Sequence, residues 1–333
     1  MLRAIALAKK AINPSPNPRV GCVIVKHNKV IAEGFHHEAG KPHAEIEALR
    51  KAGKQAQNAT LFVNLEPCNH HGKTPPCSKA ILKAGIKKVV IGMRDKSKAK
   101  GGMDFLRKNS VEVVAGICEK KCKELNQVWL KNTEKQLPYL TLKLALDENG
   151  NTIPAKGKKW ITGEKARKEV MRMRRKHDAI LVGVNTIIID NPHLTVRGIK
   201  SKQQPVRIIL NPQQRDISKA KIWRESGKTL EITQKDFPRY NLKSILQKLY
   251  HQGITSILVE GGRFTAEKLL AAGLVDKLEI FQHNNEGSPP QLFGKKFPLE
   301  WKCNFEKDSL FSGFLNHYGG VSSKKFPRKK LRN

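Results

Sequence analysis

The stretches HAE at residues 43–45 and PCNHHGKTPPC at residues 67–77 decide the fold of the first half of this chain of 333 residues. HAE begins an amphipathic run that ends at Gly53 and is typical of a helix. The apolar run TLFVNL (60–65), which precedes the second stretch, is typical of a strand. Outward from these stretches, the patterns predict strands at 20–25, 30–34, 87–93 and 111–117, and a second helix at 78–85. This alternation predicts a sheet covered by helices over residues 1–117.

The side chains of His43, Cys68 and Cys77 form a donor set that suits zinc. One imidazole and two thiolates leave the fourth tetrahedral position to water, and zinc lowers the pKa of a bound water to about 7. Glu45 lies two residues from His43, so it can carry a proton to a departing amine without being a ligand. This order of His-x-Glu, Pro-Cys and Cys matches the pattern of zinc deaminases. We therefore expect one zinc ion, hydroxide attack on a ring carbon, and Glu45 as the catalytic residue.

The spacing of the two cysteines narrows the kind of zinc deaminase that the sequence resembles. Eight residues separate Cys68 from Cys77, whereas most nucleoside and nucleobase deaminases have two. The motifs PNPRVGCV (16–23), HAE and EPCNHHGKTPPC (66–77) resemble the deaminase half of the bifunctional deaminase/reductase family of riboflavin biosynthesis. The resemblance covers about residues 2 to 117. It implies an α/β fold whose first domain is a cytidine-deaminase-like three-layer αβα domain.

The resemblance also implies a substrate, 2,5-diamino-6-(5-phosphoribosylamino)pyrimidin-4(3H)-one, which loses its 2-amino group. Asn17 and His36 would hold the ring, and Lys73 would meet the phosphate. The family's D-P-N-P loop is shortened here to residues 95–102 and has no proline. This departure weakens any assignment of substrate contacts to that loop.

The second half of the chain predicts another α/β unit. Residues 118–138 form a charged amphipathic segment, expected to be a linker helix, and residues 139–320 form the second domain. Its strands are expected at 139–146, 179–184, 205–210, 256–260 and 277–281, and its helices near 164–176, 241–252 and 264–272. Residues 321–333 are expected to be a frayed basic tail.

No Gly-x-Gly-x-x-Gly motif follows a strand in this half, so a Rossmann dinucleotide site is not expected. The turn Glu260-Gly261-Gly262 lies between an expected strand and an expected helix, where backbone N–H groups can hold a phosphate. Together with TLK (141–143), WIT (160–162) and DNP (190–192), this turn resembles the reductase half of the same family. The resemblance covers about residues 138 to 281 and implies a dihydrofolate-reductase-like α/β domain.

The resemblance further implies that NADPH is the cofactor and that a hydride converts the ribosyl chain to a ribityl chain. It assigns to NADPH the residues Lys143, Trp160, Thr186, Asp190, Gly261 and Gly262. It assigns to the phosphorylated sugar the residues Arg174, Leu194, Arg197 and Glu260, and the two arginines suit a phosphate.

Three segments depart from the family pattern in the second half. They are Asp147-Glu148-Asn149-Gly150, Lys158 and residues 282–287. The first adds negative charge where phosphates are expected nearby. These departures leave open a deaminase whose second domain has lost reductase activity.

The net charge of +34 suggests a nucleic-acid partner, but its distribution does not favour one. Residues 1–117 carry a net +13 (21 basic minus 8 acidic) and residues 118–333 a net +21 (42 minus 21). Lysine outnumbers arginine by 46 to 17, which is typical of solvated faces rather than of bidentate phosphate recognition. Nucleic acid is therefore not expected as a partner.

No apolar run is long enough to span a membrane. The apolar run at the start of the chain is interrupted by charged residues too early to be a secretory signal. The six cysteines are then more consistent with thiols or metal ligands than with disulfides. We expect a cytoplasmic homo-oligomer with no membrane partner.

Two other functions stay open from the residues alone. A deaminase of a free nucleobase or of a base in tRNA would predict two residues between the cysteines and an aromatic stacking surface. An RNA-binding protein with a structural zinc would need a fourth protein ligand, and Glu45 would then have no role.

Overall fold

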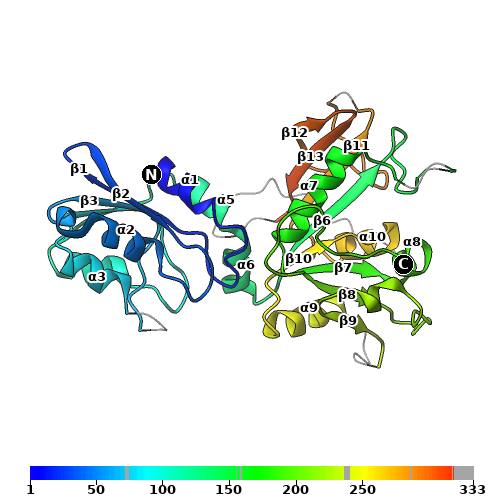
Figure 1. Ribbon diagram of the computed structural model, residues 1–333, viewed down its shortest axis with the longest axis horizontal. Coiled ribbons are helices and arrows are strands. Elements are labelled where there is room, and N and C mark those ends of the chain that lie inside the picture. The colour runs from blue at the N-terminus through cyan, green and yellow to red at the C-terminus, as the bar shows by residue number, and fades with distance from the viewer. Residues whose placement is uncertain are drawn as a thin grey trace. The chain divides into compact units, whose positions relative to one another are not determined.

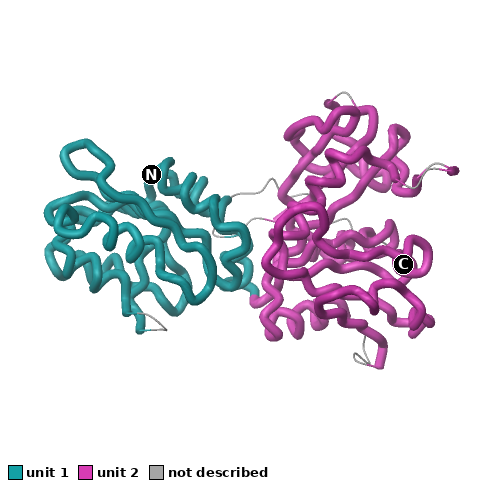
Figure 2. The backbone as a smooth tube through the Cα atoms, in the orientation of Figure 1, with its two compact units in different colours: residues 1–135, 318–321 teal, residues 136–317, 322–333 magenta. Residues whose placement is uncertain are grey.

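The computed structural model describes residues 1–71, 75–154, 156–157, 160–235, 241–285, 287–316 and 318. The chain forms two compact units, coloured separately in Figure 2. The first unit holds residues 1–135 and Tyr318, and the second holds the described residues from 136 to 316. Among the described residues, none of the helices combines the length and apolar character needed to cross a bilayer.

The first unit is built on a five-stranded sheet with the order β2-β1-β3-β4-β5. Its strands are β1 (Gly21–Lys26), β2 (Lys29–Phe35), β3 (Thr60–Leu65), β4 (Lys88–Met93) and β5 (Glu112–Ala115). β1 is antiparallel to β2 and β3, whereas β3, β4 and β5 are parallel. The expected strands of this half are therefore confirmed, with ends that differ by one or two residues.

Helices cover both faces of this sheet (Figure 1). α1 (Leu2–Ala8) and α5 (Glu119–Leu125) contact each other and the sheet, while α2 (Ala44–Ala52), α3 (Cys77–Lys83) and α4 (Gly102–Lys108) form a second group. This arrangement is the expected three-layer αβα fold. The sequence reading did not include α1 and α4, which are short helices of seven residues each.

Gly34 on β2 allows α2 to lie directly against the sheet. A Cβ atom at this position would be 2.3 Å from the carbonyl oxygen of Ala44, so no larger residue fits without moving the helix. α2 begins immediately after His43. The glycine therefore fixes the height above the sheet at which the HAE triplet lies.

Residues 118–138, expected to be one linker helix, instead form two helices that belong to the first unit through residue 135. α5 ends at Leu125 and α6 (Gln127–Lys135) follows, with Asn126 between them in a non-helical conformation (φ −108°, ψ 22°). The Asn126 side chain accepts a hydrogen bond from the N–H of Arg19 (2.8 Å) and donates one to its carbonyl oxygen (3.1 Å). The interruption between α5 and α6 therefore coincides with a tertiary contact, because the Asn126 side chain binds the distant Arg19 backbone.

The second unit contains an eight-stranded sheet with the order β12-β13-β11-β6-β10-β7-β8-β9. Its strands are β6 (Tyr139–Leu146), β7 (Ala179–Gly183), β8 (Val206–Leu210), β9 (Thr229–Ile232), β10 (Ser256–Val259), β11 (Lys277–His283), β12 (Glu300–Phe305) and β13 (Asp308–Phe314). The strands from β11 to β9 are parallel to their neighbours, and β13 and β12 add an antiparallel edge. The sequence reading missed β9, β12 and β13.

Alternation along β10 places one helix layer on each face of this sheet. Ile257 and Val259 pack with the apolar residues of α9 (Leu242–His251) and α10 (Arg263–Ala271). Leu258 packs instead with those of α7 (Glu164–Arg175). A fourth helix, α8 (Val184–Asp190), begins directly at the end of β7 and was not expected. The turns after β7 and β10 therefore lead into α8 and α10 at neighbouring strand ends.

Candidate active sites of the two units

Three elements bring the expected zinc donors together in the first unit. His43 is the N-cap of α2 in an extended conformation, Cys77 is the first residue of α3, and Cys68 follows β3. The Nδ1 atom of His43 lies 3.2 Å from Sγ of Cys77 and 3.6 Å from Sγ of Cys68. All donor atoms lie within 4.8 Å of one another. A tetrahedral zinc with bonds near 2.0 Å to nitrogen and 2.3 Å to sulfur holds its donors about 3.6 Å apart, so these three residues fit zinc.

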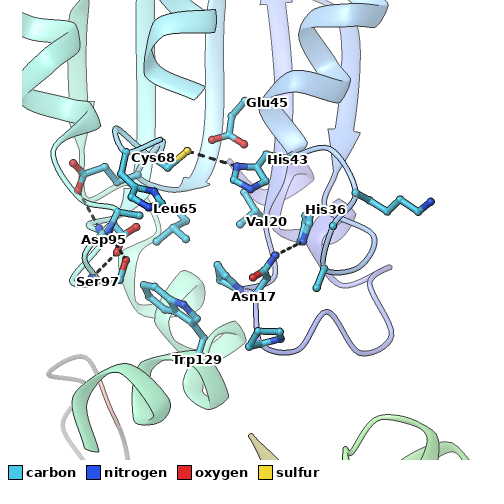
Figure 3. A pocket seen from close by; sticks show the side chains of 18 residues that line it. Asn17, Val20, His36, His43, Glu45, Leu65, Cys68, Asp95, Ser97 and Trp129 are labelled. Atoms are coloured by element: carbon cyan, nitrogen blue, oxygen red, sulfur yellow. Dashed lines mark hydrogen bonds between the residues drawn. The ribbon is translucent and has the colours of Figure 1, made fainter. Parts of the chain in front are cut away.

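Glu45 lies in the first turn of α2 and points toward the same group of donors (Figure 3). The residue is 4% exposed, and burial raises the pKa of its carboxyl to about 7. His43 and Cys68 line the same pocket as Glu45. A carboxylate therefore lies beside the metal donors at the place where proton transfer is needed.

A pocket of about 510 Å³ opens from these residues. Asn17 and His36 both line it, and the amide nitrogen Nδ2 of Asn17 lies 2.9 Å from Nε2 of His36. His36 also contacts the carbonyl oxygen of Pro42 through Nδ1 at 3.1 Å, and a proton on Nδ1 leaves Nε2 to accept from Asn17. The amide oxygen of Asn17 then has no partner among the described residues and can accept a hydrogen bond from a ligand.

The pocket also contains residues that the sequence reading did not assign. Asp95, Ser97 and Trp129 line it on the side shown in Figure 3. Glu66 shapes the loop that carries Asp95 and Ser97, because its buried carboxylate accepts hydrogen bonds from the backbone N–H groups of Asp95, Gly101 and Met103. Glu66 stands next to Pro67-Cys68 in the sequence, which was the available signal for its importance. Lys73, expected at the phosphate, lies outside the described residues.

Among the described residues, no fourth protein ligand closes the donor set. Within the part of the chain that the structure describes, His43, Cys68 and Cys77 form the only cluster of His, Cys, Asp and Glu side chains suited to a metal. A structural zinc site normally has four protein ligands, whereas a catalytic site keeps one position open. The geometry therefore fits a catalytic site, and the alternative of an RNA-binding protein with structural zinc is not favoured.

In the second unit, Arg174 and Glu260 bind each other rather than lying free. Nε and Nη2 of Arg174 donate to the two carboxylate oxygens of Glu260 at 2.7 and 2.9 Å, and Nη1 donates to the carbonyl oxygen of Thr195 at 2.9 Å. Both side chains are 9% exposed. We expected both residues at the phosphorylated sugar, and here three of the five N–H donors of Arg174 are used within the protein. Two N–H donors remain for a phosphate, and the assignment of Arg174 to the sugar stays a prediction.

Lys143 is half-buried near this pair. Burial lowers the pKa of its ammonium group, and the carboxylate of Glu260 partly opposes that shift. Burial by itself would raise the pKa of Glu260, but Arg174 lowers it below its ordinary value. These three residues therefore form a largely buried charged cluster, with Lys143 in the middle of β6, Glu260 directly after β10 and Arg174 on α7.

Thr186 and Gly262, both assigned to the cofactor, are brought together by the turns after β7 and β10. The N–H of Gly262 donates to Oγ1 of Thr186 at 3.3 Å, and Gly262 is the N-cap of α10. A Cβ atom at Gly261 would lie 2.9 Å from Cβ of Thr265, so the turn requires a residue without a side chain. The structure thus forms a tight double turn at which the backbone can approach a ligand.

The other residues assigned to this unit are arranged differently. Leu194 is buried in the apolar cluster beside α8, with a positive φ of 50°. Asp190 and Arg197 are exposed, and Trp160 is 53% exposed, with the guanidinium of Arg167 over its ring at 5.4 Å. Their roles toward cofactor and sugar remain predictions.

Two of the segments that depart from the family pattern lie side by side. The carboxylate of Asp147 accepts hydrogen bonds from the N–H groups of Asn149 and Asn151, so its charge is used to form the turn. The Glu148 carboxylate accepts a hydrogen bond from Asn284 at 3.3 Å. These hydrogen bonds hold the two carboxylates in place and leave their negative charge in this segment. Lys158 lies outside the described residues.

The zinc-donor geometry and the αβα fold define the first unit as a deaminase of the cytidine-deaminase class, and the second unit is a separate α/β domain. Residues 1–93 match the cytidine and deoxycytidylate deaminase zinc-binding region, and residues 138–294 match the RibD C-terminal domain.

Known proteins resemble the chain over most of its length. The riboflavin biosynthesis protein RibD of Aquifex aeolicus is 41% identical over 302 residues, which is 84% of this chain and 85% of that protein. The RibD of Escherichia coli is 37% identical over 314 residues, covering 84% and 86%.

Solved structures agree with these sequence matches. Acinetobacter baumannii RibD has a TM-score of 0.82 at 34% identity and covers 93% of this chain and 96% of its own. A diaminohydroxyphosphoribosylaminopyrimidine deaminase/5-amino-6-(5-phosphoribosylamino)uracil reductase from Thermotoga maritima has a TM-score of 0.82 at 34% identity, covering 94% and 96%.

The chain belongs to the RibD family of riboflavin biosynthesis proteins and is both a deaminase and a reductase. The expected family, fold class and pair of activities are thereby confirmed. A nucleobase or tRNA deaminase, or a deaminase with a second domain that has lost its activity, is not favoured.

Proposed function

We propose that the first unit removes the 2-amino group of 2,5-diamino-6-(5-phosphoribosylamino)pyrimidin-4(3H)-one, with one zinc ion held by His43, Cys68 and Cys77. The observation that carries this proposal is the convergence of these three donors with Glu45 in one pocket. The name of the Thermotoga maritima relative, a diaminohydroxyphosphoribosylaminopyrimidine deaminase, supports the choice of substrate. When bound, zinc supplies a water molecule whose pKa is lowered to about 7.

The protein's own residues would then move the protons and hold the ring. Glu45 would take a proton from the water on one carboxylate oxygen and deliver it to the departing amine nitrogen. Asn17, oriented by His36, would accept a hydrogen bond from the ring or its amino group through its free amide oxygen. The pocket volume of about 510 Å³ lies within the range of roughly 300–1,000 Å³ that is typical of small-molecule sites. Lys73, by its place in the GKTPPC motif, would meet the phosphate.

We further propose that the second unit reduces the ribosyl chain of 5-amino-6-(5-phosphoribosylamino)uracil to a ribityl chain, with NADPH as the source of the hydride. The name of the Thermotoga maritima relative supports this substrate. The double turn at Thr186 and Gly262 supports a cofactor phosphate close to the backbone. The remaining contacts to NADPH would come from Lys143, Trp160, Asp190 and Gly261, and those to the sugar from Arg174, Leu194, Arg197 and Glu260.

An assay of both products on one preparation tests these functions. The purified chain, loaded with zinc, receives the diaminopyrimidine nucleotide and NADPH, and the release of ammonia and the loss of reduced-nicotinamide absorbance are followed together. Both signals are expected, with ammonia released first. Absence of ammonia from a zinc-loaded protein would refute the deaminase substrate. Ammonia release without NADPH consumption would refute the reductase proposal.

A cytoplasmic location and a homo-oligomeric state also belong to this proposal. The six cysteines are all free thiols, which fits a reducing compartment. Ile189 and Phe264 are 77% and 67% exposed, and large exposed apolar side chains often mark a contact surface. Light scattering on the purified chain would measure its mass in solution, and a monomer at micromolar concentration would refute the oligomer.

A further inference from the structure

Trp129 lines the deaminase pocket although it lies far along the chain from the zinc motifs. The residue belongs to α6, and in Figure 3 its side chain points into the pocket from the side away from Glu45. No role follows for it from the sequence, because residues 118–138 were expected to be a linker. Its place on the pocket wall opposite Glu45 puts it within reach of the part of a substrate that extends away from the reacting carbon.

Contacts to both walls of the pocket fix the helix that carries Trp129. Asn126, one turn before Trp129, makes two hydrogen bonds with the backbone of Arg19, which closely follows Asn17. Glu134, near the end of α6, forms an ion pair with Lys96 at 3.3 Å, in the loop that carries Asp95 and Ser97. Gln127 adds a reciprocal pair of hydrogen bonds with the backbone of Tyr318. The helix that carries the indole is therefore held in place before a ligand binds.

The indole N–H of Trp129 has no hydrogen-bond acceptor among the described residues. By contrast, the indole of Trp223 donates to the carbonyl oxygen of Ile217 at 2.8 Å, and that of Trp301 donates to Oδ1 of Asn304 at 2.9 Å. Tryptophan is amphipathic, and its N–H normally finds a partner when the ring is enclosed. A half-buried indole with an unused donor on a pocket wall thus indicates a ligand that supplies an acceptor.

The proposed substrate has such an acceptor in the right region. Its ring must lie near His43 and Glu45, because the amine departs there, and its phosphoribosyl arm then extends away from these two residues into the rest of the pocket. The arm carries sugar C–H groups that can pack on an aromatic face and hydroxyl and phosphate oxygens that can accept a hydrogen bond.

We propose that Trp129 is a specificity-determining residue that contacts the phosphoribosyl arm of the deaminase substrate through its ring face and its N–H. This inference rests on the deaminase function proposed above. Trp129 would contribute to binding the arm and leave the chemistry at the ring to Glu45 and the zinc donors.

Steady-state ammonia release with the diaminopyrimidine nucleotide tests the proposal in three variants. W129A is expected to raise KM at least tenfold and to change kcat by less than about threefold, because it removes both the packing surface and the donor. W129F is expected to raise KM by a smaller factor, since it keeps an aromatic face. W301A is the matched control and is expected to leave KM unchanged, because Trp301 lies in the second unit with its N–H already bonded. Zinc content is expected to stay at one ion per chain in all three.

The same variants with the dephosphorylated substrate identify the acceptor. A KM difference that persists without the phosphate assigns the contact to the sugar, and one that disappears assigns it to the phosphate; both support the proposal. An unchanged KM in W129A and W129F would overturn it, as would a fall in kcat at constant KM. If W129A does not fold, W129F alone decides by the same criterion. A wild-type protein that binds zinc but releases no ammonia refutes the proposed deaminase function instead of this inference.

Discussion

The deaminase pocket of the first unit and the charged cluster of the second unit use their polar side chains in opposite ways. In the pocket, the sulfurs of Cys68 and Cys77 and the imidazole of His43 converge on one another, and the amide oxygen of Asn17 has no partner among the described residues. In the cluster, Arg174 and Glu260 satisfy each other through two hydrogen bonds. Unused bonding capacity that converges on one point indicates a ligand. Capacity that is largely used by a neighbouring residue stabilises the shape of a site, here the one proposed to hold the sugar.

This difference has an energetic reason. A buried polar group without a partner costs about 1–3 kcal/mol, and a ligand or a metal that supplies the missing partner removes that cost. A buried ion pair with two good hydrogen bonds needs no ligand. Removing either partner leaves the other charge buried and unpaired, which lowers the free energy of unfolding. The comparison predicts that substitutions in the deaminase pocket mainly lower turnover. It predicts that substitutions in the charged cluster of the second unit lower the free energy of unfolding.

Removal of zinc should have the largest effect and should act on one unit only. A chelator is expected to reduce ammonia release to the background rate, because the donors then hold no metal to acidify water. NADPH consumption with the deaminated substrate is expected to stay within about twofold, since the described part of the second unit has no comparable donor cluster. Parallel measurement of both rates, followed by addition of zinc, checks this. Equal loss of both activities would break the comparison.

The E45Q variant should lower deaminase turnover by about 10²–10⁴-fold, the usual contribution of a general acid–base group. Gln has nearly the same shape but cannot carry the proton, so the zinc content is expected to stay at one ion per chain. Metal analysis and ammonia release on the same sample provide the measurement. Loss of zinc together with activity would show that Glu45 supports the metal site rather than the proton transfer.

The E260Q variant should lower the free energy of unfolding of the second unit by about 3–5 kcal/mol, because it leaves the guanidinium of Arg174 buried without its counter-charge. Denaturant unfolding of the full chain measures this. The matched control is E306Q, which removes an exposed partner of Lys165 and is expected to cost less than about 1 kcal/mol. If E260Q matches E306Q, the charged cluster does not stabilise the second unit.

Acidification from pH 7 to pH 5 should destabilise the second unit through His177, with a smaller effect. Burial lowers the pKa of this imidazole to about 4, and its nitrogens contact the carbonyl oxygen of Met173 and Oγ1 of Thr141. An unfolded His has a pKa near 6.5, so between pH 6.5 and about 4 the unfolded chain binds a proton that the folded chain does not. Stability in that window therefore falls as pH falls, by at most about 2 kcal/mol at pH 5.

The variant H177Q is expected to remove this part of the pH dependence. Unfolding of the wild type and the variant at pH 7 and pH 5 gives the comparison. The same loss on acidification in both proteins would assign the effect to other groups.

Much of the fold could be predicted from local pattern, and the omissions have a common cause. The strands β3, β6 and β7 are apolar runs between polar or glycine-rich segments, so periodicity marked them clearly. β9 and β12 were missed because they are the edge strands of the sheet, and β12 carries charged residues such as Lys302. β13 lies inside the sheet between β12 and β11, but Ser309, Ser312 and Gly313 interrupt its apolar pattern. The break at Asn126 was missed because its cause is a hydrogen-bond partner, Arg19, that lies 107 residues away.

The functional residues also divide into those that local sequence could predict and those that it could not. His43, Glu45, Cys68 and Cys77 could be named from sequence because zinc chemistry restricts the residue types and their order. Trp129 and the free amide oxygen of Asn17 could not, because whether an indole or an amide is satisfied depends on its neighbours in space.

The sequence by itself determined which groups are available for chemistry, since donor type and proton-carrying capacity are properties of individual side chains. It also determined the alternation of helices and strands, which follows from local periodicity. Only the tertiary structure decided which of those groups are used up by partners and which remain free for a ligand. The physical reason is that hydrogen bonds and ion pairs act over a few ångströms in space, and the residues they join, such as Arg174 and Glu260, can be 86 positions apart in the chain.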